Sequence, residues 1–160
     1  MYRFLRILPA LLLVMGCEGS LADREKEARQ ALDARDFAKA RQVSEQALAS
    51  SAASQDAPTA WRLEQIRLES LANDKQSAEV VASLQRLSGT YPTQVTPALY
   101  RSLADKLKTA GDTTGAIDVL AAGHERFPNE AQAFVKDIDA LKQGKLDPAQ
   151  IEKLKALGYL

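Results

Sequence analysis

The sequence predicts an all-α fold built from helical hairpins, and three observations support this prediction. From Leu21 onward, apolar residues recur at the three- and four-residue spacing of a helix. The chain is rich in Ala, Leu, Gln, Glu, Lys and Arg, which favour helices. The alternation of apolar β-branched and polar residues that is typical of strands is almost absent. We therefore expect about three hairpins stacked in a row, followed by C-terminal helices that cap the stack.

Composition limits the possible function classes. The chain has 160 residues, enough for one domain, and its 21 basic residues balance its 21 acidic residues. This balance disfavours a nucleic-acid-binding protein that relies on net charge. The single Cys excludes an internal disulfide, and the single His excludes the His pairs of most catalytic metal sites.

Residues 1–16 are expected to be a cleaved signal peptide. Arg3 and Arg6 form a basic start, and an apolar run from Ile7 to Met15 follows. As a helix this run covers only ~14 Å, about half of the hydrocarbon core, and is too short for a permanent span. The tetrapeptide Val14-Met15-Gly16-Cys17 resembles the lipobox of bacterial lipoproteins. That resemblance implies cleavage before Cys17 and lipidation of its thiol; a free cysteine or an uncleaved anchor are the alternatives.

The lipobox resemblance also implies a location. Residues 17–21 would comprise the lipidated Cys17 and a short tether that holds the folded body close to the membrane. Glu18 is not the Asp that usually retains lipoproteins at the inner membrane, so we expect anchorage in the outer membrane, facing the periplasm. Loss of two arginines with the signal peptide leaves the mature chain at about −2, so the lipid rather than charge would hold it there.

Residues 22–53 are expected to form the first hairpin. Arg35-Asp36-Phe37 supplies the turn, and Ser44 stands where a large apolar residue is expected. The Ala- and Ser-rich stretch from Ala49 to Pro58 is the one flexible connection that the sequence suggests.

Residues 58–92 are expected to form a divergent second hairpin. Pro58 opens it, Asn73-Asp74 breaks it, and Tyr91-Pro92 closes it. Val80, Leu84 and Leu87 suit its second helix. The many apolar residues between Trp61 and Leu71 cannot all be placed on one face of its first helix.

The third hairpin has the clearest pattern. Thr96-Pro97 is a helix start, Gly111 a helix end, and Asp112 a cap for a second helix that Pro128 ends. Its consensus positions are Tyr100, Leu103, Ala104, Leu107, Ala116, Leu120, Gly123 and Pro128. This spacing resembles the tetratricopeptide repeat. The resemblance covers residues 22–143, is most specific over 97–128, and implies a short right-handed α-solenoid whose first helices line a concave binding surface.

Two terminal helices are expected to close the open end of the solenoid. Residues 129–143 carry Phe134, Ile138 and Leu141 on one face and begin at Asn129. Residues 147–158 form the C-terminal capping helix, which starts with the cap signature Asp147-Pro148.

The tetratricopeptide resemblance nominates binding residues on the first helices. Arg101, Asp105 and Lys108 in the third hairpin, and Glu25 and Arg29 in the first, would face the concave groove. Asp105 stands where the carboxylate-clamp members of the family have Asn, so that clamp is not carried over. The alternative is that Arg101, Asp105 and Lys108 only pair with one another along the helix surface.

The sequence offers little for catalysis. His124 is more typical of a surface or partly packed residue, and Trp61 of packing between helices, although Trp61 could stack on a ligand. We found no phosphate loop, nucleophile elbow or metal-ligand spacing, so we expect no enzyme, cofactor or metal site.

We therefore expect a lipid-anchored adaptor or scaffold in envelope assembly or secretion. Its partner would be another envelope protein or a peptide segment, not nucleic acid. The alternatives are a structural lipoprotein that self-associates into a homo-oligomer and, more remotely, an enzyme. The sequence identifies neither the partner nor the pathway.

Overall fold

The computed structural model describes residues 19–144 and 146–160. The proposed signal peptide, residues 1–16, and Cys17 lie outside the described residues. Within the described part the regular structure is entirely helical, which confirms the predicted all-α class. The elements are α1 Leu21–Asp33, α2 Phe37–Leu48, α3 Ala57–Asn73, α4 Ser77–Thr90, α5 Pro97–Thr109, α6 Thr113–Arg126, the short 3₁₀ helix η1 Pro128–Glu130, α7 Ala131–Lys142 and α8 Pro148–Ala156.

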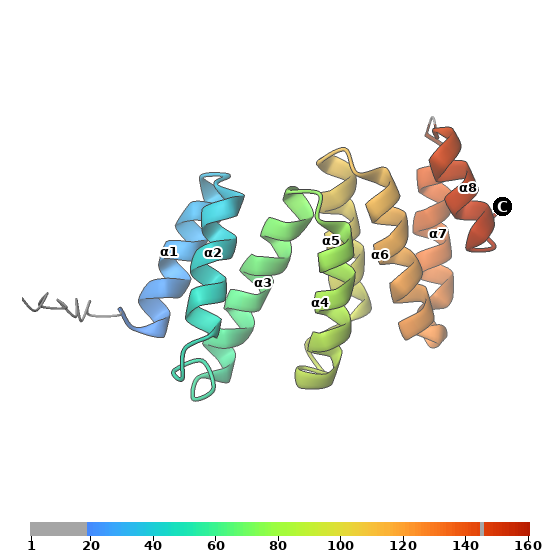
Figure 1. The fold of residues 1–160 in the computed structure, drawn as a ribbon. Helices are drawn as coiled ribbons and strands as arrows, with labels where there is room; N and C mark the ends of the chain where they lie inside the picture. The colour runs from blue at the N-terminus through green and yellow to red at the C-terminus, as the bar shows by residue number, and fades with distance from the viewer. Residues whose placement is uncertain (1–18, 145) are drawn as a thin grey trace, which may run out of the picture.

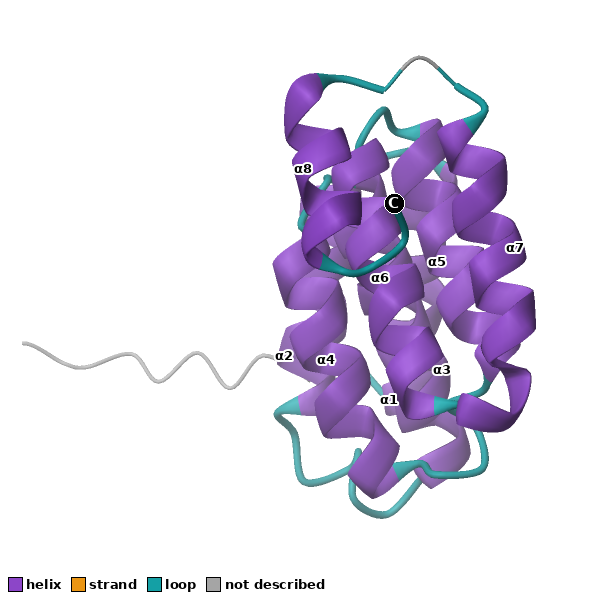
Figure 2. Cartoon of the chain, turned by 90° about the vertical axis from the view of Figure 1, so that its right-hand side faces the viewer, coloured by secondary structure: helices purple, strands orange, loops and turns teal. Residues whose placement is uncertain are grey.

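The helices form two layers that follow the chain from one end to the other (Figures 1 and 2). One layer holds α1, α3, α5 and α7, and the other holds α2, α4, α6 and α8. Helix α3 packs against α1, α2, α4 and α5, while α6 packs against α4, α5, α7 and α8. Each helix thus contacts near neighbours in the chain, an arrangement compatible with a short solenoid.

The three hairpins share one turn geometry. The turn residues Arg35, Lys75 and Gly111 all have left-handed backbone conformations, with φ of 60°, 61° and 88°. In each turn the N–H of the residue after the left-handed one donates to the carbonyl five positions earlier, as Asp112 N–H does to Leu107 O at 2.8 Å. This is the Schellman pattern, which satisfies the last carbonyls of the first helix. Only the third hairpin has glycine there, the residue that adopts this conformation without strain.

Most of the helices in the layer of α1, α3, α5 and α7 begin at a residue whose side chain caps the helix. The carboxylate of Asp56 accepts from Thr59 N–H at 3.1 Å, and Thr96 accepts from Leu99 N–H at 3.4 Å. Asp147 and Gln150 form a reciprocal capping box at the start of α8, in agreement with the predicted start of the C-terminal helix. The prediction that Asn129 opens α7 is wrong, because residues 128–130 form a 3₁₀ turn and α7 starts after it.

Two apolar clusters form the interior of the described part of the chain, and α3 contributes to both. Ala60, Leu63 and Ile66 join the cluster of α1 and α2, while Leu68 and Leu71 join the cluster of α4 to α8. Because α3 is covered by four other helices, apolar residues surround much of it. This explains why its pattern does not fit a single buried face.

The residues of the tetratricopeptide-like spacing lie at the contacts of the third hairpin. Six of them, Tyr100, Leu103, Ala104, Leu107, Ala116 and Leu120, are at most 3% exposed. Gly123 is also buried, and a Cβ built there would lie 2.4 Å from the Phe134 ring. Pro128 is exposed and begins η1, so it ends α6 rather than filling the core.

Among the described residues, no helix combines the length and the hydropathy needed to cross a bilayer.

Candidate functional site

The candidate site is a hollow of about 280 Å³ between α5 and α7, with α6 as its floor. We call it the α5–α7 hollow. Its apolar lining comprises Ala104, Ala116, Leu120, Ala140 and Leu141. Its polar lining comprises Arg101, Asp105, Lys108 and Asp137.

The α5 side of the hollow follows from helical geometry. Arg101, Asp105 and Lys108 are spaced by four and three residues, so they lie along one stripe of the helix. This stripe runs beside the buried stripe that contains Leu103 and Leu107. Burial of the apolar stripe against α6 therefore turns the charged stripe toward α7. The small side chains of Ala104 and Ala116 leave space between the two walls.

Arg101 joins the two walls of the hollow. Its guanidinium makes two hydrogen bonds to Asp137 on α7, a bidentate pair. The hydrogen bond to Asp137 is the main cause that raises the pKa of Arg101. The alternative that Arg101 pairs with Asp105 along α5 is therefore wrong. The carboxylate on α7 captures the guanidinium instead and fixes the separation of α5 and α7 at this end.

Asp105 and Lys108 remain available for binding. Both are exposed, and neither belongs to an ion pair among the residues that the structure describes. The hollow therefore presents an apolar floor with one anionic and one cationic group above it. Such a surface can receive an apolar side chain while its neighbours on a polypeptide meet opposite charges.

The two candidates from the first hairpin do not join this hollow. Arg29 lines a second hollow of about 440 Å³ beside α3 and α5, where Glu69 and Lys106 form an ion pair of 3.2 Å. Glu25 on α1 pairs with Arg62 on α3 at 2.8 Å and lines neither hollow. The structure thus brings together three of the five nominated residues.

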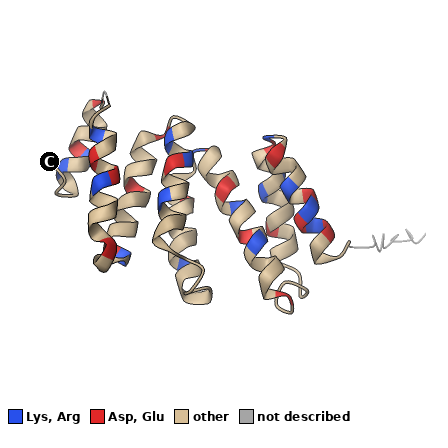
Figure 3. Cartoon of the chain, turned by 180° about the vertical axis from the view of Figure 1, so that it is seen from behind, with Lys and Arg blue, Asp and Glu red and all other residues tan. Residues whose placement is uncertain are grey.

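Charges of both signs are interspersed over the layer of α1, α3, α5 and α7 (Figure 3). The ion pairs between neighbouring first helices, such as Arg62 with Glu25 and Lys106 with Glu69, account for part of this pattern. A mixed surface of this kind lacks the single-sign field that draws nucleic acid.

The side chains considered for catalysis make structural contacts. The His124 Nδ1 atom lies 2.6 Å from the Tyr159 hydroxyl, an interaction that ties the C-terminal tail to α6. Burial, followed by the charge of Glu125, raises the pKa of Tyr159. In the described ranges, no group of His, Cys, Asp and Glu side chains is arranged to hold a metal ion.

Sequence reasoning missed the α7 wall of the hollow. It nominated neither Asp137 nor Ala140 as a binding residue. The available signal was the spacing of Asp137, Ala140 and Leu141, which places all three on one face of a helix. That spacing does not reveal which helix α7 faces, because the contact depends on the whole stack.

Comparisons with protein-family models, curated proteins and solved structures found no match.

Proposed function

We propose that this protein is a membrane-anchored, tetratricopeptide-like lipoprotein that acts as a protein-binding adaptor in the bacterial envelope. The observation that carries the proposal is the α5–α7 hollow, with its apolar floor and its unpaired Asp105 and Lys108. It lies in the layer of first helices, the layer that binds peptides in the repeat family that the sequence resembles.

The hairpin turns support the repeat assignment. Arg35, Lys75 and Gly111 adopt the same left-handed conformation at equivalent points of three successive hairpins. The last two of these residues are 36 positions apart, close to the period of about 34 residues of tetratricopeptide repeats. Successive units with one turn geometry are what a repeat array requires, because each unit must present the same faces to its neighbours.

The size of the hollow favours a peptide side chain over a small-molecule cofactor. Its volume of about 280 Å³ is at the lower limit for ligand pockets, which are about 300–1,000 Å³. One aliphatic side chain of a partner would occupy the floor, and the flanking backbone would run along the groove. Basic and acidic residues near that anchor would then pair with Asp105 and Lys108, and charge complementarity would set the orientation.

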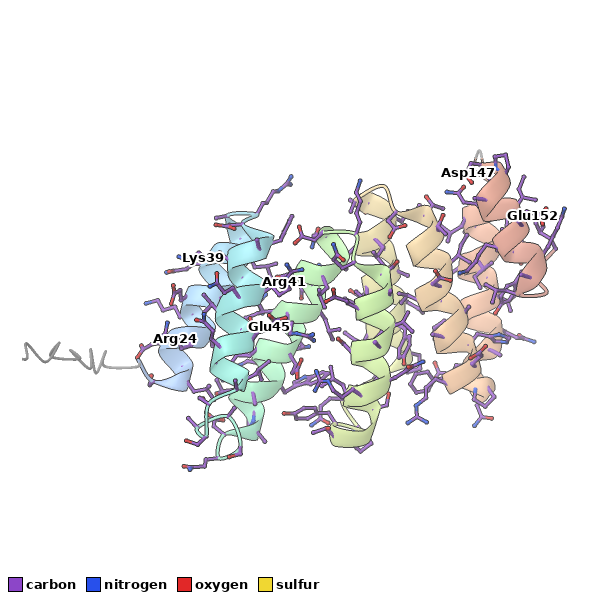
Figure 4. All side chains as sticks on the ribbon, viewed as in Figure 1. Arg24, Lys39, Arg41, Glu45, Asp147 and Glu152 are labelled. Carbon is purple, nitrogen blue, oxygen red and sulfur yellow. The ribbon has the colours of Figure 1, made fainter. Side chains whose placement is uncertain are left out.

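Photo-crosslinking in cells tests the adaptor role. We would place a photoreactive residue at position 108 and a matched probe at position 152, because the Glu152 side chain is 73% exposed on α8 and does not line the α5–α7 hollow (Figure 4). We expect position 108 to capture one discrete envelope protein that position 152 does not. The charge reversal Lys108→Glu should reduce that capture in a second experiment with the probe at position 105.

Other results of the same experiment would contradict the adaptor role. Capture of a second copy of this chain from position 108 would favour the self-associating structural lipoprotein. Equal capture from positions 108 and 152 would show contact without a specific groove.

Membrane anchorage is tested separately through Cys17. The variant Cys17→Ser should release the protein into the soluble periplasmic fraction or leave an uncleaved precursor. Mature protein that stays in the membrane fraction after this change would disprove the lipid anchor and leave the binding groove untouched.

A further inference from the structure

A second hollow lies at the edge of the molecule where α3 begins and α4 ends, apart from the α5–α7 hollow. It has a volume of about 560 Å³, and we call it the Trp61 hollow. The rings of Trp61 and Tyr91 lie side by side in it, with centroids 5.1 Å apart and planes inclined by 45°. Both side chains are half-buried, so each ring packs on the core and still reaches the surface.

The backbone fixes these two rings from opposite sides. Trp61 lies in the second turn of α3, and Pro58 in the first turn stiffens the approach to it. Tyr91 is the C-cap of α4, and its N–H donates to Leu87 O at 2.7 Å. Pro92 follows directly and ends the helix. The inclined rings therefore form a wedge with walls that are held by two different helices.

Every polar side chain in the lining of the Trp61 hollow carries a hydrogen-bond donor. The Trp61 indole and the Arg62 guanidinium only donate, whereas the hydroxyls of Thr90, Tyr91 and Thr93 both donate and accept. Arg62 is held in place by Glu25 at 2.8 Å and by the Thr59 hydroxyl at 2.7 Å. No carboxylate belongs to the described lining, and Arg62 is its one charged residue.

We propose that the Trp61 hollow binds a proline-rich segment of a protein in the polyproline II conformation. Such a segment has carbonyl acceptors and, at its prolines, no N–H donors, so it complements a lining that is rich in donors and has no carboxylate. The two ring centroids are only 5.1 Å apart, so a proline ring packs on the exposed surface that Trp61 and Tyr91 form together and not between them, as proline-rich segments pack on aromatic-lined grooves elsewhere.

A carbohydrate is the competing ligand for an exposed aromatic pair. Sugar hydroxyls are donors as well as acceptors, and they need carboxylate or amide acceptors close to the stacking ring. Gln94 is the one amide in the lining, and its oxygen already accepts from Thr93 at 2.9 Å. Among the lining side chains a sugar would therefore find only hydroxyl acceptors, which are weaker than a carboxylate, and the hollow favours the proline-rich segment.

Trp61 is the only tryptophan of the chain, so its fluorescence reports on this hollow directly. We would titrate the protein with a polyproline peptide of three helical turns, about nine residues. We expect a saturable change in Trp61 emission. A Gly-Ser peptide of the same length and a linear glucose oligosaccharide should leave the emission unchanged.

Two exposed positions supply a matched pair of variants. Thr93→Asp puts a carboxylate at the rim of the hollow, where it repels the carbonyls of the peptide, and should weaken binding about fivefold or more. Ser54→Asp adds the same charge in the exposed loop before α3, outside the hollow, and should leave the affinity unchanged. Both residues are exposed, and a circular dichroism melt checks that each variant folds like the parent.

The proposal is overturned if the polyproline peptide leaves Trp61 emission unchanged in the folded protein. It is also overturned if the oligosaccharide or the Gly-Ser peptide produces the same response, or if Thr93→Asp and Ser54→Asp bind equally well. None of these results depends on Asp105 or Lys108, so this test and the test of the α5–α7 hollow can fail independently.

Discussion

Equivalent positions of the second and third hairpins make different kinds of contact with the neighbouring helices. In the third hairpin, the residues eleven and eight positions before the left-handed turn are Tyr100 and Leu103, each 1% exposed. Tyr100 makes edge-to-face contacts with Phe127 and Phe134, with centroids 5.7 and 6.5 Å away. We call this the apolar junction.

In the second hairpin, the same count gives Glu64 and Arg67. Arg86 on α4 reaches Glu64 at 2.8 Å, and Arg67 lies 3.6 Å from Glu64 and 3.1 Å from Glu45 on α2. Figure 4 shows Glu45 on α2 in the view of Figure 1. The Glu64 side chain is only 7% exposed, and its Oε2 atom has no hydrogen-bond partner. We call this the polar junction.

The difference shows that the same hairpin backbone accepts either polar or apolar side chains at these positions. The two sets of side chains differ in how much they stabilise the stack. The attraction within a buried ion pair does little more than offset the cost of removing its charges from water. Packed aromatic rings, in contrast, contribute the whole free energy of burying their apolar surface. The two apolar clusters of the molecule are separate, and both include parts of α3. We infer that the apolar junction supplies most of the cohesion between hairpins, and that α3 carries the connection across the polar junction.

The largest expected effect comes from truncation at the apolar junction. Phe134→Ala removes a fully buried ring that contacts Tyr100 and Phe127, and should cost about 3–5 kcal/mol. The matched change at the polar junction, Glu45→Ala, removes a side chain that is 47% exposed and leaves Arg67 beside Glu64, so it should cost less than about 1 kcal/mol. Urea denaturation of both variants measures the difference. Equal losses would contradict the contrast between the junctions.

A smaller effect is expected from a methyl group added beside the same ring. Gly123→Ala improves helix propensity by about 1 kcal/mol, but the new Cβ would lie 2.4 Å from the Phe134 ring. Displacing a fully buried ring costs about 1–3 kcal/mol, so the net change should be destabilising. The equivalent residue of the first hairpin is already alanine, Ala47, and is 4% exposed. A stabilised Gly123→Ala protein in a thermal melt would show that Phe134 moves freely.

Replacing the polar side chains of the polar junction by those of the apolar junction tests its contribution to stability directly. The double variant Glu64→Tyr with Arg67→Leu places the residues of the third hairpin in the second, and removes a buried charge together with its partner. We expect a free energy of unfolding unchanged within about 1 kcal/mol or increased by up to about 4 kcal/mol. Glu64→Leu alone should be destabilising, because Arg67 then loses its buried partner. A double variant less stable than this single variant would mean that the ion pairs are a source of stability.

The all-α class and the turns followed from local signals. Apolar spacing and side-chain caps act within a few residues, so the start of α5 at Thr96-Pro97 and of α8 at Asp147-Pro148 could be placed from the sequence. Asn129 was misplaced because it lies in the 3₁₀ turn that follows Pro128. A Pro followed by a cap residue is compatible with a 3₁₀ turn as well as with the start of an α-helix.

Only the α5 side of the α5–α7 hollow was predicted from the sequence. Arg101, Asp105 and Lys108 were found because the repeat pattern marks which positions of α5 are not needed for packing. The partner of Arg101 could not be found in the same way, because Asp137 is 36 residues away and their contact depends on the separation of α5 and α7. The polar junction was missed for a related reason. The register of α3 becomes clear only when the left-handed turn at Lys75 is aligned with that at Gly111.

The smallest expected effect distinguishes the caps of α3 and α5, the first helices of the second and third hairpins. Hydrogen bonds from the Thr59 side chain and backbone lower the pKa of Asp56, which caps α3. The cap of α5 is Thr96, which does not titrate over the same range. Because the pKa of Asp56 is lower in the folded than in the unfolded chain, its contribution is fully present above the ordinary aspartate value of about 3.9. It is lost as the pH falls through the lower folded value.

Acid should therefore loosen the start of α3 before the start of α5. Amide hydrogen exchange measured between about pH 5 and pH 2, and corrected for intrinsic rates, should show protection falling at Thr59 and constant at Leu99. Asp56→Asn retains a capping oxygen without a titrating group, so it should remove the pH dependence at Thr59. Parallel loss of protection at Thr59 and Leu99 would instead mean that acid acts on the whole stack.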